Sequence, residues 1–446
     1  FKISEIDPNL FWLEYRKKDT KQMHNFFWLS LIDRKTNHTK LKQIIYIWML
    51  KNSKYKKNIW ETSTLSVRVI SWILNVDIIL NNSTFDFKKN FFKCIISQTN
   101  HLKRNIKFEK DLSKKIEILT AIILTGLVFK EYKENFNIGI KELEILIKDF
   151  FDNNGFPLSR NPNDLIFFFK YLLFCKEVIK DSQKYIPEFL EDIVEKNLNC
   201  IHFIKTPNNQ LPLFNGATPL NLDQIDKYLE NFKSDNKNNN LGGLFRIKHK
   251  KNFLLIDIDK PPEKKFSKSY QSGPLSFEFF LDGVKIITNC GFGKHVSKKA
   301  ELLSRLTACQ STLTINDTSI TNFEKNEMIN KVFGNSIQNS FKSFDFSSTN
   351  ENNLIGCSVS SNGYEKRFGC THKREIYFDK ENNCLKGIDH VFKTKDGYPI
   401  RYAFRFHINP ELSVVKTMSG NSALIQISKN KSLIFSVANE NLEVEK

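Results

Sequence analysis

The 446-residue sequence contains no uninterrupted apolar stretch long enough to cross a bilayer. The nearest approach is Leu165–Phe174, which Lys170 interrupts, and we expect a buried helix there. The chain begins with Phe1 rather than Met, so we treat the sequence as a fragment or a processed product. The lack of a signal peptide in this sequence is therefore not evidence about where the protein is located.

The eight cysteines lack the spacing of a metal site, since no CxxC or Cys/His ligand pattern occurs. Neither a zinc site nor a disulfide framework is predicted. Cys290, Cys309 and Cys370 lie in apolar stretches without a visible activating partner, so we expect small buried side chains there. RNP, zinc-finger and P-loop signatures are also missing, and we expect no nucleic-acid partner.

The formal net charge is +18, from 67 Lys and Arg against 49 Asp and Glu. Such a balance predicts affinity for polyanions. Nucleic acid, anionic membrane and acidic polysaccharide all satisfy it. The alternative is a Lys-, Asn- and Ile-rich compositional bias that only produces a solvated cationic surface. The net charge alone does not distinguish this alternative from binding to one of the three polyanions.

The first half of the chain has helical periodicity. Apolar residues recur on one face in four stretches, and Gly155–Pro157 ends the last of them. Many amphipathic helices with short polar loops and no fixed repeat predict an incomplete (α/α) toroid. The apolar stretches are Leu41–Trp48, Leu65–Leu80, Ile116–Leu127 and Ile140–Phe150.

The second half alternates apolar and polar residues instead, in Leu275–Leu281, Leu313–Ile315 and Tyr402–Ile408. Asp282-Gly283 and Asn362-Gly363 are typical of hairpin turns. We therefore predict a C-terminal antiparallel β-sandwich. The predicted boundaries are 1–232 for the helical domain, 233–241 for a polar linker and 242–446 for the β-sandwich.

Ten short segments, in chain order, carry a distinctive succession of residue types. In the helical half they are Met23–Leu29, Trp60–Trp72 with Arg68, Thr99–Asn105, Asn154–Pro162 and Leu213–Gly216. In the β half they are Gly273–Glu278, Asn289–Gly291, Ser311–Leu313, His372–Arg374 and Phe404–His407.

Together these segments resemble motifs of the heparinase II/III-like proteins, in particular their shorter alphaproteobacterial type. Met23–Leu29 is similar to an LH-x-F-x-WL opening, and Thr99–Asn105 to an NH-(x)3-N element. Leu213–Gly216 matches LFNG, and Gly273–Glu278 matches an H-A-(D/G)-x-LSFE strand except at its histidine. Each motif is weak alone, but the ordered set covers nearly the whole chain.

The resemblance implies a lyase that cuts uronate-containing polysaccharides by β-elimination. Such an enzyme neutralises the substrate carboxylate, removes the C5 proton and protonates the leaving oxygen. By this resemblance, Asn100 would donate to the carboxylate and His101 would take part in proton transfer; a polar pair bonded within the helices is the alternative. Arg160 would hold a carboxylate bidentately or brace the turn before Pro162.

The sequence also departs from the family pattern. The expected tyrosine falls near Asp164, and the His/Asp/His set of metal-carrying relatives falls on Gln271, Asn289 and Gln310. Amides are poor zinc ligands, so we expect no metal and no cofactor. Gln271 and Gln310 would instead bind substrate or form a hydrogen-bonded amide cluster.

His372 and Arg374 lie on a predicted strand. They would face a cleft between the domains, as a catalytic and a substrate-binding residue, or lie on a solvated strand face.

The sequence therefore predicts a polysaccharide lyase or lyase-like protein acting on an acidic glycan. A catalytically reduced protein that binds anionic glycans in envelope metabolism is the alternative. The resemblance implies the cell envelope or periplasm, and the cytoplasm stays open. The glycan and the oligomeric state are not determined.

Overall fold

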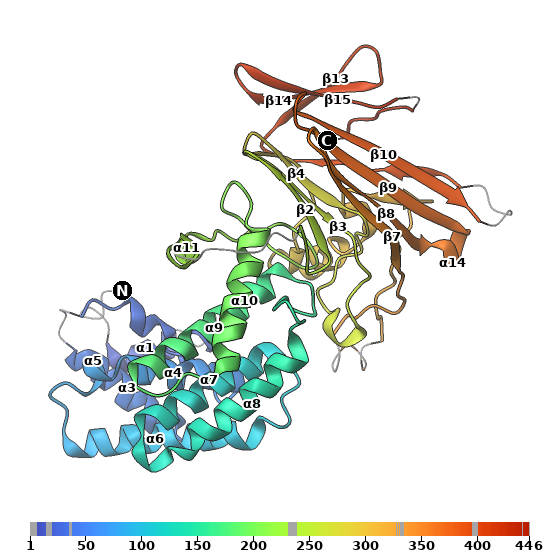
Figure 1. Ribbon diagram of the computed structural model, residues 1–446. Helices are drawn as coiled ribbons and strands as arrows, with labels where there is room; N and C mark the ends of the chain where they lie inside the picture. The colour runs from blue at the N-terminus through green and yellow to red at the C-terminus, as the bar shows by residue number, and fades with distance from the viewer. Residues whose placement is uncertain are drawn as a thin grey trace. The chain divides into compact units, whose positions relative to one another are not determined.

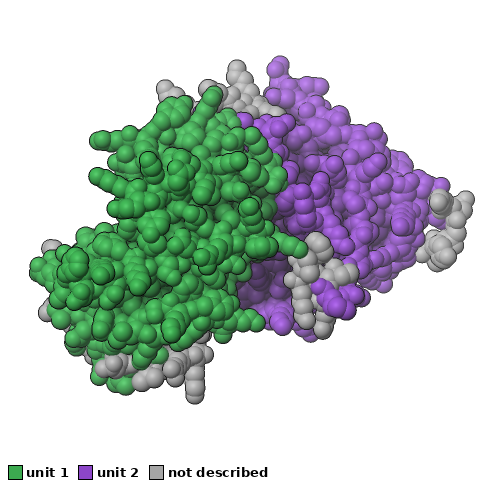
Figure 2. Space-filling view, turned by 90° about the horizontal axis from the view of Figure 1, so that it is seen from below, with its two compact units in different colours: residues 1–150, 167–194 green, residues 151–166, 195–446 purple. Residues whose placement is uncertain are grey.

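The computed structural model describes residues 7–14, 20–34, 38–230, 239–326, 328, 330, 334–394, 400–438 and 440–445. The chain forms two compact units, coloured separately in Figure 2. Unit 1 comprises residues 1–150 and 167–194, and unit 2 comprises residues 151–166 and 195–446. Unit 2 thus includes two segments, 151–166 and 195–230, of the region predicted from the sequence to be the helical domain. Residues 233–238 of the predicted linker lie outside the described residues.

The N-terminal region is helical, as predicted (Figure 1). Short 3-10 turns, η2 (Phe27–Leu31) and η3 (Lys130–Tyr132), occur between some of the helices. Across the described residues, no helix has the length and apolar character that crossing a membrane requires. The helices are α1 (Pro8–Glu14), α2 (Thr20–His24), α3 (Thr39–Asn52), α4 (Thr62–Leu74), α5 (Val76–Leu80), α6 (Phe85–Asn105), α7 (Leu112–Val128), α8 (Glu134–Phe150), α9 (Pro162–Asp181), α10 (Glu188–Ile204) and α11 (Asp223–Glu230).

Side-chain caps set where several of these helices begin. Glu61 accepts the backbone N–H of Thr64 at 3.1 Å before α4, and Asp111 accepts that of Ser113 at 3.0 Å before α7. Each cap satisfies a backbone donor that has no partner inside the helix. α7 is buried almost all round, from Ile116 to Gly126, as an inner helix of a layered array must be.

An aromatic core fixes the start of unit 1. Phe26, from the first family-like segment, packs edge-on against both Trp48 and Trp72, with ring centroids 5.5 and 5.2 Å apart. Trp48 and Trp72 contact each other edge-on at 5.3 Å. Such edge-to-face pairs add about 0.5–1.5 kcal/mol each beyond the burial of apolar area.

The C-terminal region is β-rich and its sheets are antiparallel. The strand orders are β1-β2-β3-β4-β5-β12, β10-β9-β8-β7, β11-β6 and β13-β14-β15. The strands are β1 (Asn240–Leu241), β2 (Leu244–His249), β3 (Asn252–Asp257), β4 (Phe277–Leu281), β5 (Val284–Thr288), β6 (Leu313–Ile315), β7 (Ser343–Asn350), β8 (Leu354–Tyr364), β9 (Cys370–Asp379), β10 (Cys384–Lys393), β11 (Tyr402–Phe404), β12 (His407–Ile408), β13 (Ser413–Lys416), β14 (Ser422–Ser428) and β15 (Lys431–Ser436).

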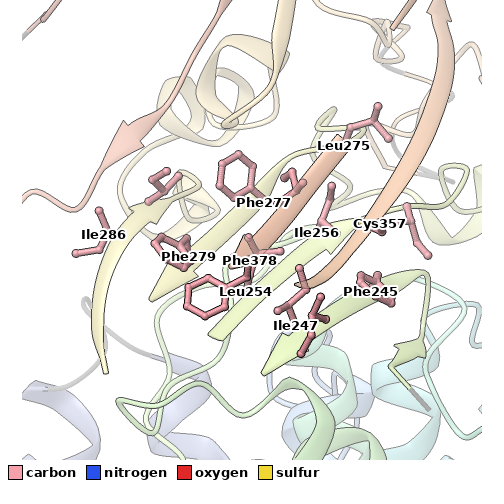
Figure 3. Packing of buried hydrophobic residues seen from close by; sticks show 14 of the residues in the cluster. Phe245, Ile247, Leu254, Ile256, Leu275, Phe277, Phe279, Ile286, Cys357 and Phe378 are labelled. Carbon is pink, nitrogen blue, oxygen red and sulfur yellow. The ribbon is translucent and has the colours of Figure 1, made fainter. Parts of the chain in front are cut away.

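The main core of unit 2 joins residues from two sheets (Figure 3). Leu254, Ile256 and Phe279 come from the six-stranded sheet, whereas Cys357 and Phe378 come from the four-stranded sheet. Their side chains lie in one cluster of buried residues, so the two sheets share a hydrophobic core.

Three details differ from the sequence prediction. The alternation in β4 does not mark an exposed face, because all five of its residues are buried; Glu278 is buried with Lys285, 3.1 Å away. The single run predicted at Tyr402–Ile408 is divided between β11, which pairs with β6, and β12, which pairs with β5.

The third difference is the turn predicted at Asn362-Gly363, which was wrong. Both residues lie inside β8, next to a register shift. The Asn362 side chain accepts the backbone N–H of Lys342 at 2.7 Å, a strand contact rather than a turn contact. The chain reverses later, where Gly369 takes the left-handed φ of 61°. By contrast, the turn at Asp282-Gly283 is present between β4 and β5.

Candidate functional site

Asn100 and His101 lie side by side near the end of α6, and both are half-exposed. The Asn105 amide donates to the backbone oxygen of His101 at 2.8 Å and so holds the last turn of the helix. The amide of Asn100 makes no hydrogen bond within the part of the chain that the structure describes. Both side chains are thus available to a ligand.

A buried arginine orients this part of α6. Arg68 of α4 is fully buried, and its Nε donates to Gln98 Oε1 at 2.6 Å, two residues before Asn100. Its Nη1 donates to the backbone oxygen of His24 at 2.7 Å, and its guanidinium lies 4.4 Å above the Trp48 ring. Burial lowers the pKa of Arg68 to about 9, so it keeps its charge at neutral pH.

The imidazole of His101 lies among aromatic rings. It meets the Trp60 ring edge-on at 5.3 Å and the Tyr55 ring at 5.6 Å. Burial, reinforced by the nearby Arg104, lowers the pKa of His101 below its usual value. The imidazole is therefore neutral at pH 7 and can accept a proton.

Tyr55 was not identified from the sequence. It is 64% exposed, close to His101, in a loop that follows α3. The signal was available, because Tyr55 is the one aromatic residue within a run that contains four lysines. An exposed tyrosine ring among lysines suits a sugar that carries negative groups. The tyrosine ring offers apolar area to the sugar ring, and the lysines offer positive charge to its negative groups.

Arg160 is placed differently from Asn100 and His101. It is 7% exposed, and its φ of 58° is left-handed. Its guanidinium donates to Asp257 at 2.7 Å and to the backbone oxygens of Lys260 and Gly243 at 2.8 Å each. Burial opposes the charge, but Asp257 raises the pKa of Arg160 above its usual value. In this conformation the guanidinium is occupied inside unit 2, and its substrate-binding role stays a prediction.

His372 and Arg374 both lie on the buried face of β9. Arg374 is 1% exposed and binds both oxygens of Asp389, at 2.7 and 3.0 Å. Its Nη1 also donates to the backbone oxygens of Leu275 and Ser311, at 2.8 and 2.9 Å. His372 Nε2 lies 2.7 Å from the same carboxylate.

The protonation of this buried group follows from its contacts. Burial would raise the pKa of Asp389, but Arg374 and the hydrogen bonds hold it below its usual range. Burial lowers the pKa of His372, with Asp389 opposing the effect. The carboxylate is charged at neutral pH, and the group connects β9 to β10 within unit 2.

The amides at the positions of the relatives' metal ligands are also buried. Gln271 Nε2 donates to the backbone oxygens of Cys290 and Ser304 at 2.8 Å each. Gln310 Nε2 donates to the same oxygen of Ser304 at 3.1 Å. Asn289 Oδ1 accepts the backbone N–H of Ser311 at 2.9 Å. The amides thus hydrogen-bond to backbone groups of one small region.

The prediction of buried side chains at Cys290 and Cys309 was wrong. Both are half-buried, and the backbone N–H of Cys290 donates to the backbone oxygen of Cys309 at 3.0 Å, while the Cys309 thiol donates to the backbone oxygen of Leu303 at 3.2 Å. Their segments are 19 residues apart in sequence, so no local pattern could reveal the contact. Cys370 is buried, as predicted.

Unit 2 contains an open pocket of about 730 Å³. Its lining includes the carboxylates of Asp152 and Asp259, several asparagines and hydroxyl groups, and the Phe245 and Phe346 rings at 5.5 Å. No lysine or arginine belongs to this lining, as far as the structure describes the chain. A glycan rich in negative charge is therefore poorly matched to it.

The comparisons with known proteins agree with the motifs. Residues 233–446 match the family model for the heparinase II/III-like C-terminal domain, which confirms the resemblance. A search among curated proteins gave no match.

Solved structures share the fold of nearly the whole chain. The crystal structure of heparinase III aligns with a TM-score of 0.74 and 15% identity, over 96% of this chain and 72% of that chain. Heparan sulfate lyase HepC from Pedobacter heparinus aligns with a TM-score of 0.69 and 17% identity, over 95% of this chain and 70% of that one. At these identities the likeness establishes the fold alone.

Proposed function

We propose that this chain, whose residues 233–446 form a heparinase II/III-like domain, is a polysaccharide lyase-like protein that cleaves acidic, uronate-containing glycans by β-elimination. The observation that carries the proposal is the pair Asn100 and His101. These residues match the family's NH element, lie half-exposed on α6 and adjoin an exposed tyrosine.

The roles follow from the chemistry of each group. The Asn100 amide donates to the substrate carboxylate and stabilises the charge that develops on it when the C5 proton leaves. The neutral imidazole of His101 accepts that proton. The Tyr55 phenol, exposed beside His101, donates a proton to the departing glycosidic oxygen in place of the tyrosine that is missing near Asp164.

The charge around the pair supports an anionic substrate. Lys54 and Lys57 lie within two residues of Tyr55 and are exposed, and Arg104 is exposed on α6 near His101. Positive charges in this arrangement raise the local concentration of a polyanion and are screened by salt. Arg68 is a positioning residue, because it acts through Gln98 and the backbone.

The architecture that we propose for each unit is the one expected from the family. An incomplete (α/α) toroid is consistent with the amphipathic helices around the buried α7. A sandwich is consistent with the core that the two larger sheets share. We place the activity in the cell envelope or periplasm, where acidic glycans are accessible; fractionation of cells with an antibody to the chain tests this.

A second function is favoured by a separate observation. The other five predicted site residues are all buried, and their side chains are engaged with protein groups. These residues are Arg160, Gln271, Gln310, His372 and Arg374. A protein that binds an acidic glycan through α6 without cleaving it needs none of them, so a catalytically reduced glycan-binding protein is the alternative.

One experiment separates the two functions. The full chain is incubated with a panel of acidic polysaccharides, and absorbance in the unsaturated-uronate band is followed over time. A lyase produces this band, and His101→Ala lowers the rate by about 10²–10⁴-fold, the usual contribution of a general base. His295→Ala, at an exposed histidine of unit 2, serves as the matched control and leaves the rate unchanged.

Binding titrations complete the test. If no polysaccharide yields product, but Asn100→Ala weakens binding of a uronate glycan by about 1–3 kcal/mol, the binding function is supported. The control Asn90→Ala removes an exposed amide on the same helix, ten residues before Asn100. Equal losses for the glycan and for DNA, or no loss for either, would contradict a specific site and leave only general cationic attraction.

A further inference from the structure

Cys290 and Cys309 come together from two segments of unit 2. Cys290 follows the end of β5, and Cys309 ends the short 3-10 turn η6 (Thr307–Cys309). The backbone N–H of Cys290 donates to the backbone oxygen of Cys309 at 3.0 Å. The two backbones are therefore as close as those of neighbouring strands.

The other six cysteines are arranged differently. Five of them are buried, and Cys384 is exposed. Their hydrogen bonds go to backbone oxygens or to other residue types, as with Cys200 and the oxygen of Asn154. Cys290 and Cys309 differ in that a backbone hydrogen bond joins them, although the Cys309 thiol also donates to a backbone oxygen, that of Leu303, at 3.2 Å.

The surroundings favour a reactive thiolate at Cys309. The hydrogen bond from Cys290 lowers the pKa of Cys309 to about 7, although burial opposes this, and Arg405 adds its positive charge. A thiol with a pKa near the ambient pH is the most effective attacking group in thiol–disulfide exchange. Both residues are half-buried rather than enclosed, so a small oxidant has access.

We propose that Cys290 and Cys309 are a modification site at which an intramolecular disulfide forms by exchange with a disulfide oxidant, such as oxidised glutathione. The Cys309 thiolate attacks one sulfur of the oxidant, forms a mixed disulfide and expels one thiolate. The Cys290 thiol then loses its proton to solvent and attacks Cys309, which releases the second thiolate. Two protein thiols are oxidised, and one disulfide of the oxidant is reduced to two thiols.

The cross-link would close a segment that contains η5 (Gly293–His295) and α12 (Lys298–Leu303). It would also fix Ser304, whose backbone oxygen accepts the amides of Gln271 and Gln310. A disulfide restricts the unfolded chain, and the effect grows with the length of the closed loop. We therefore expect oxidation to stabilise unit 2, whether or not the protein is a lyase.

The test is carried out on the full chain with all eight cysteines. The reduced protein is incubated with oxidised glutathione, the remaining thiols are blocked, and the digest is examined by mass spectrometry with and without reductant. The expected product is a reductant-sensitive peptide that links Cys290 to Cys309. The exposed Cys384 acquires glutathione in the same sample and shows that the oxidant is active.

Single variants provide the second measurement. Cys290→Ser should stop at a mixed disulfide of Cys309 with glutathione, because the resolving thiol is missing. Cys309→Ser should leave Cys290 largely unmodified, because the attacking thiolate is missing. Oxidised wild-type protein should melt roughly 5–10 °C higher than the reduced form, and neither variant should show this shift. Modification of Cys384 without a Cys290–Cys309 peptide, or cross-links through other cysteines, would overturn the proposal.

Discussion

Replacing Arg374 with methionine is expected to destabilise unit 2 by about 3–5 kcal/mol, the usual cost of removing one partner of a buried ion pair. The guanidinium of Arg374 donates four hydrogen bonds, two to Asp389 and one each to the oxygens of Leu275 and Ser311. Methionine keeps most of the side-chain volume, so the loss reports the polar contacts rather than a cavity. Arg401→Met is the matched control at an exposed arginine, with an expected change within about 0.5 kcal/mol.

The choice of probe matters in this assay. All five tryptophans lie between residues 12 and 72, so tryptophan fluorescence reports unit 1. Denaturation of unit 2 is better followed by hydrogen exchange of β8, β9 and β10, in increasing guanidinium chloride. Arg374→Met should lose protection in these strands at lower denaturant, while the fluorescence transition stays close to that of the wild type.

A double variant sharpens the prediction. Arg374→Met combined with Asp389→Leu removes both charges, and such a replacement is often neutral or stabilising. The double variant should therefore be more stable than Arg374→Met alone. A cost below about 1 kcal/mol for Arg374→Met, together with weaker glycan binding, would refute the structural role and restore the ligand role predicted from the sequence.

Three further predictions concern pH, salt and one glycine. The pKa of His24 is lowered to about 4 by burial, Arg68 and Lys56. Between about pH 6.5 and 4 the unfolded chain therefore binds more protons than the folded chain, and unit 1 should lose stability as the pH falls through this range. Denaturation followed by tryptophan fluorescence should show this loss, and His24→Gln should make the stability less dependent on pH. Binding of any acidic polysaccharide should weaken steeply between about 50 and 200 mM salt, and a flat salt titration would contradict a role for the +18 charge. Gly155→Ala should destabilise the chain by more than about 1 kcal/mol in thermal unfolding. The reason is that Gly155 has a φ of +81°, and an added Cβ would lie 2.5 Å from Lys196 Cβ. An unchanged stability would show that this turn can shift.

The lowered pKa of His101 adds a kinetic prediction that holds if the chain is a lyase. A base with a depressed pKa stays neutral above that pKa, so the rate should be level through neutral pH and fall only below about 6.5. A rate that declines from pH 8 downward would assign the proton transfer to another group.

The sequence by itself determined the parts of the fold that depend on local pattern. Apolar residues at helical spacing predicted α3, α4, α7 and α8, because one face of each must be buried. The change to alternating residues predicted antiparallel strands in the second half. The ordered motifs also predicted the family, which the match over residues 233–446 confirms.

The sequence of β9 also contains an alternating pattern that predicts which residues are buried, but the charged residues in it favoured a different interpretation. Cys370, Ile376 and Phe378 alternate with polar residues and share a face with His372 and Arg374. This period of two placed both polar residues inside, although their charge suggested a solvated face or a cleft. The pairing with β10 brings Asp389 opposite Arg374, and this contact offsets the cost of burying His372 and Arg374.

Only the tertiary structure decided which polar residues are engaged and which are free. The partner of Arg160 is Asp257, 97 residues away in the chain, and the backbone hydrogen bond between Cys290 and Cys309 joins separate segments. Hydrogen bonds and ion pairs act over a few ångströms in space, so sequence spacing does not reveal them. Helical and strand periods, in contrast, are set by the local backbone, and the sequence therefore carries them directly.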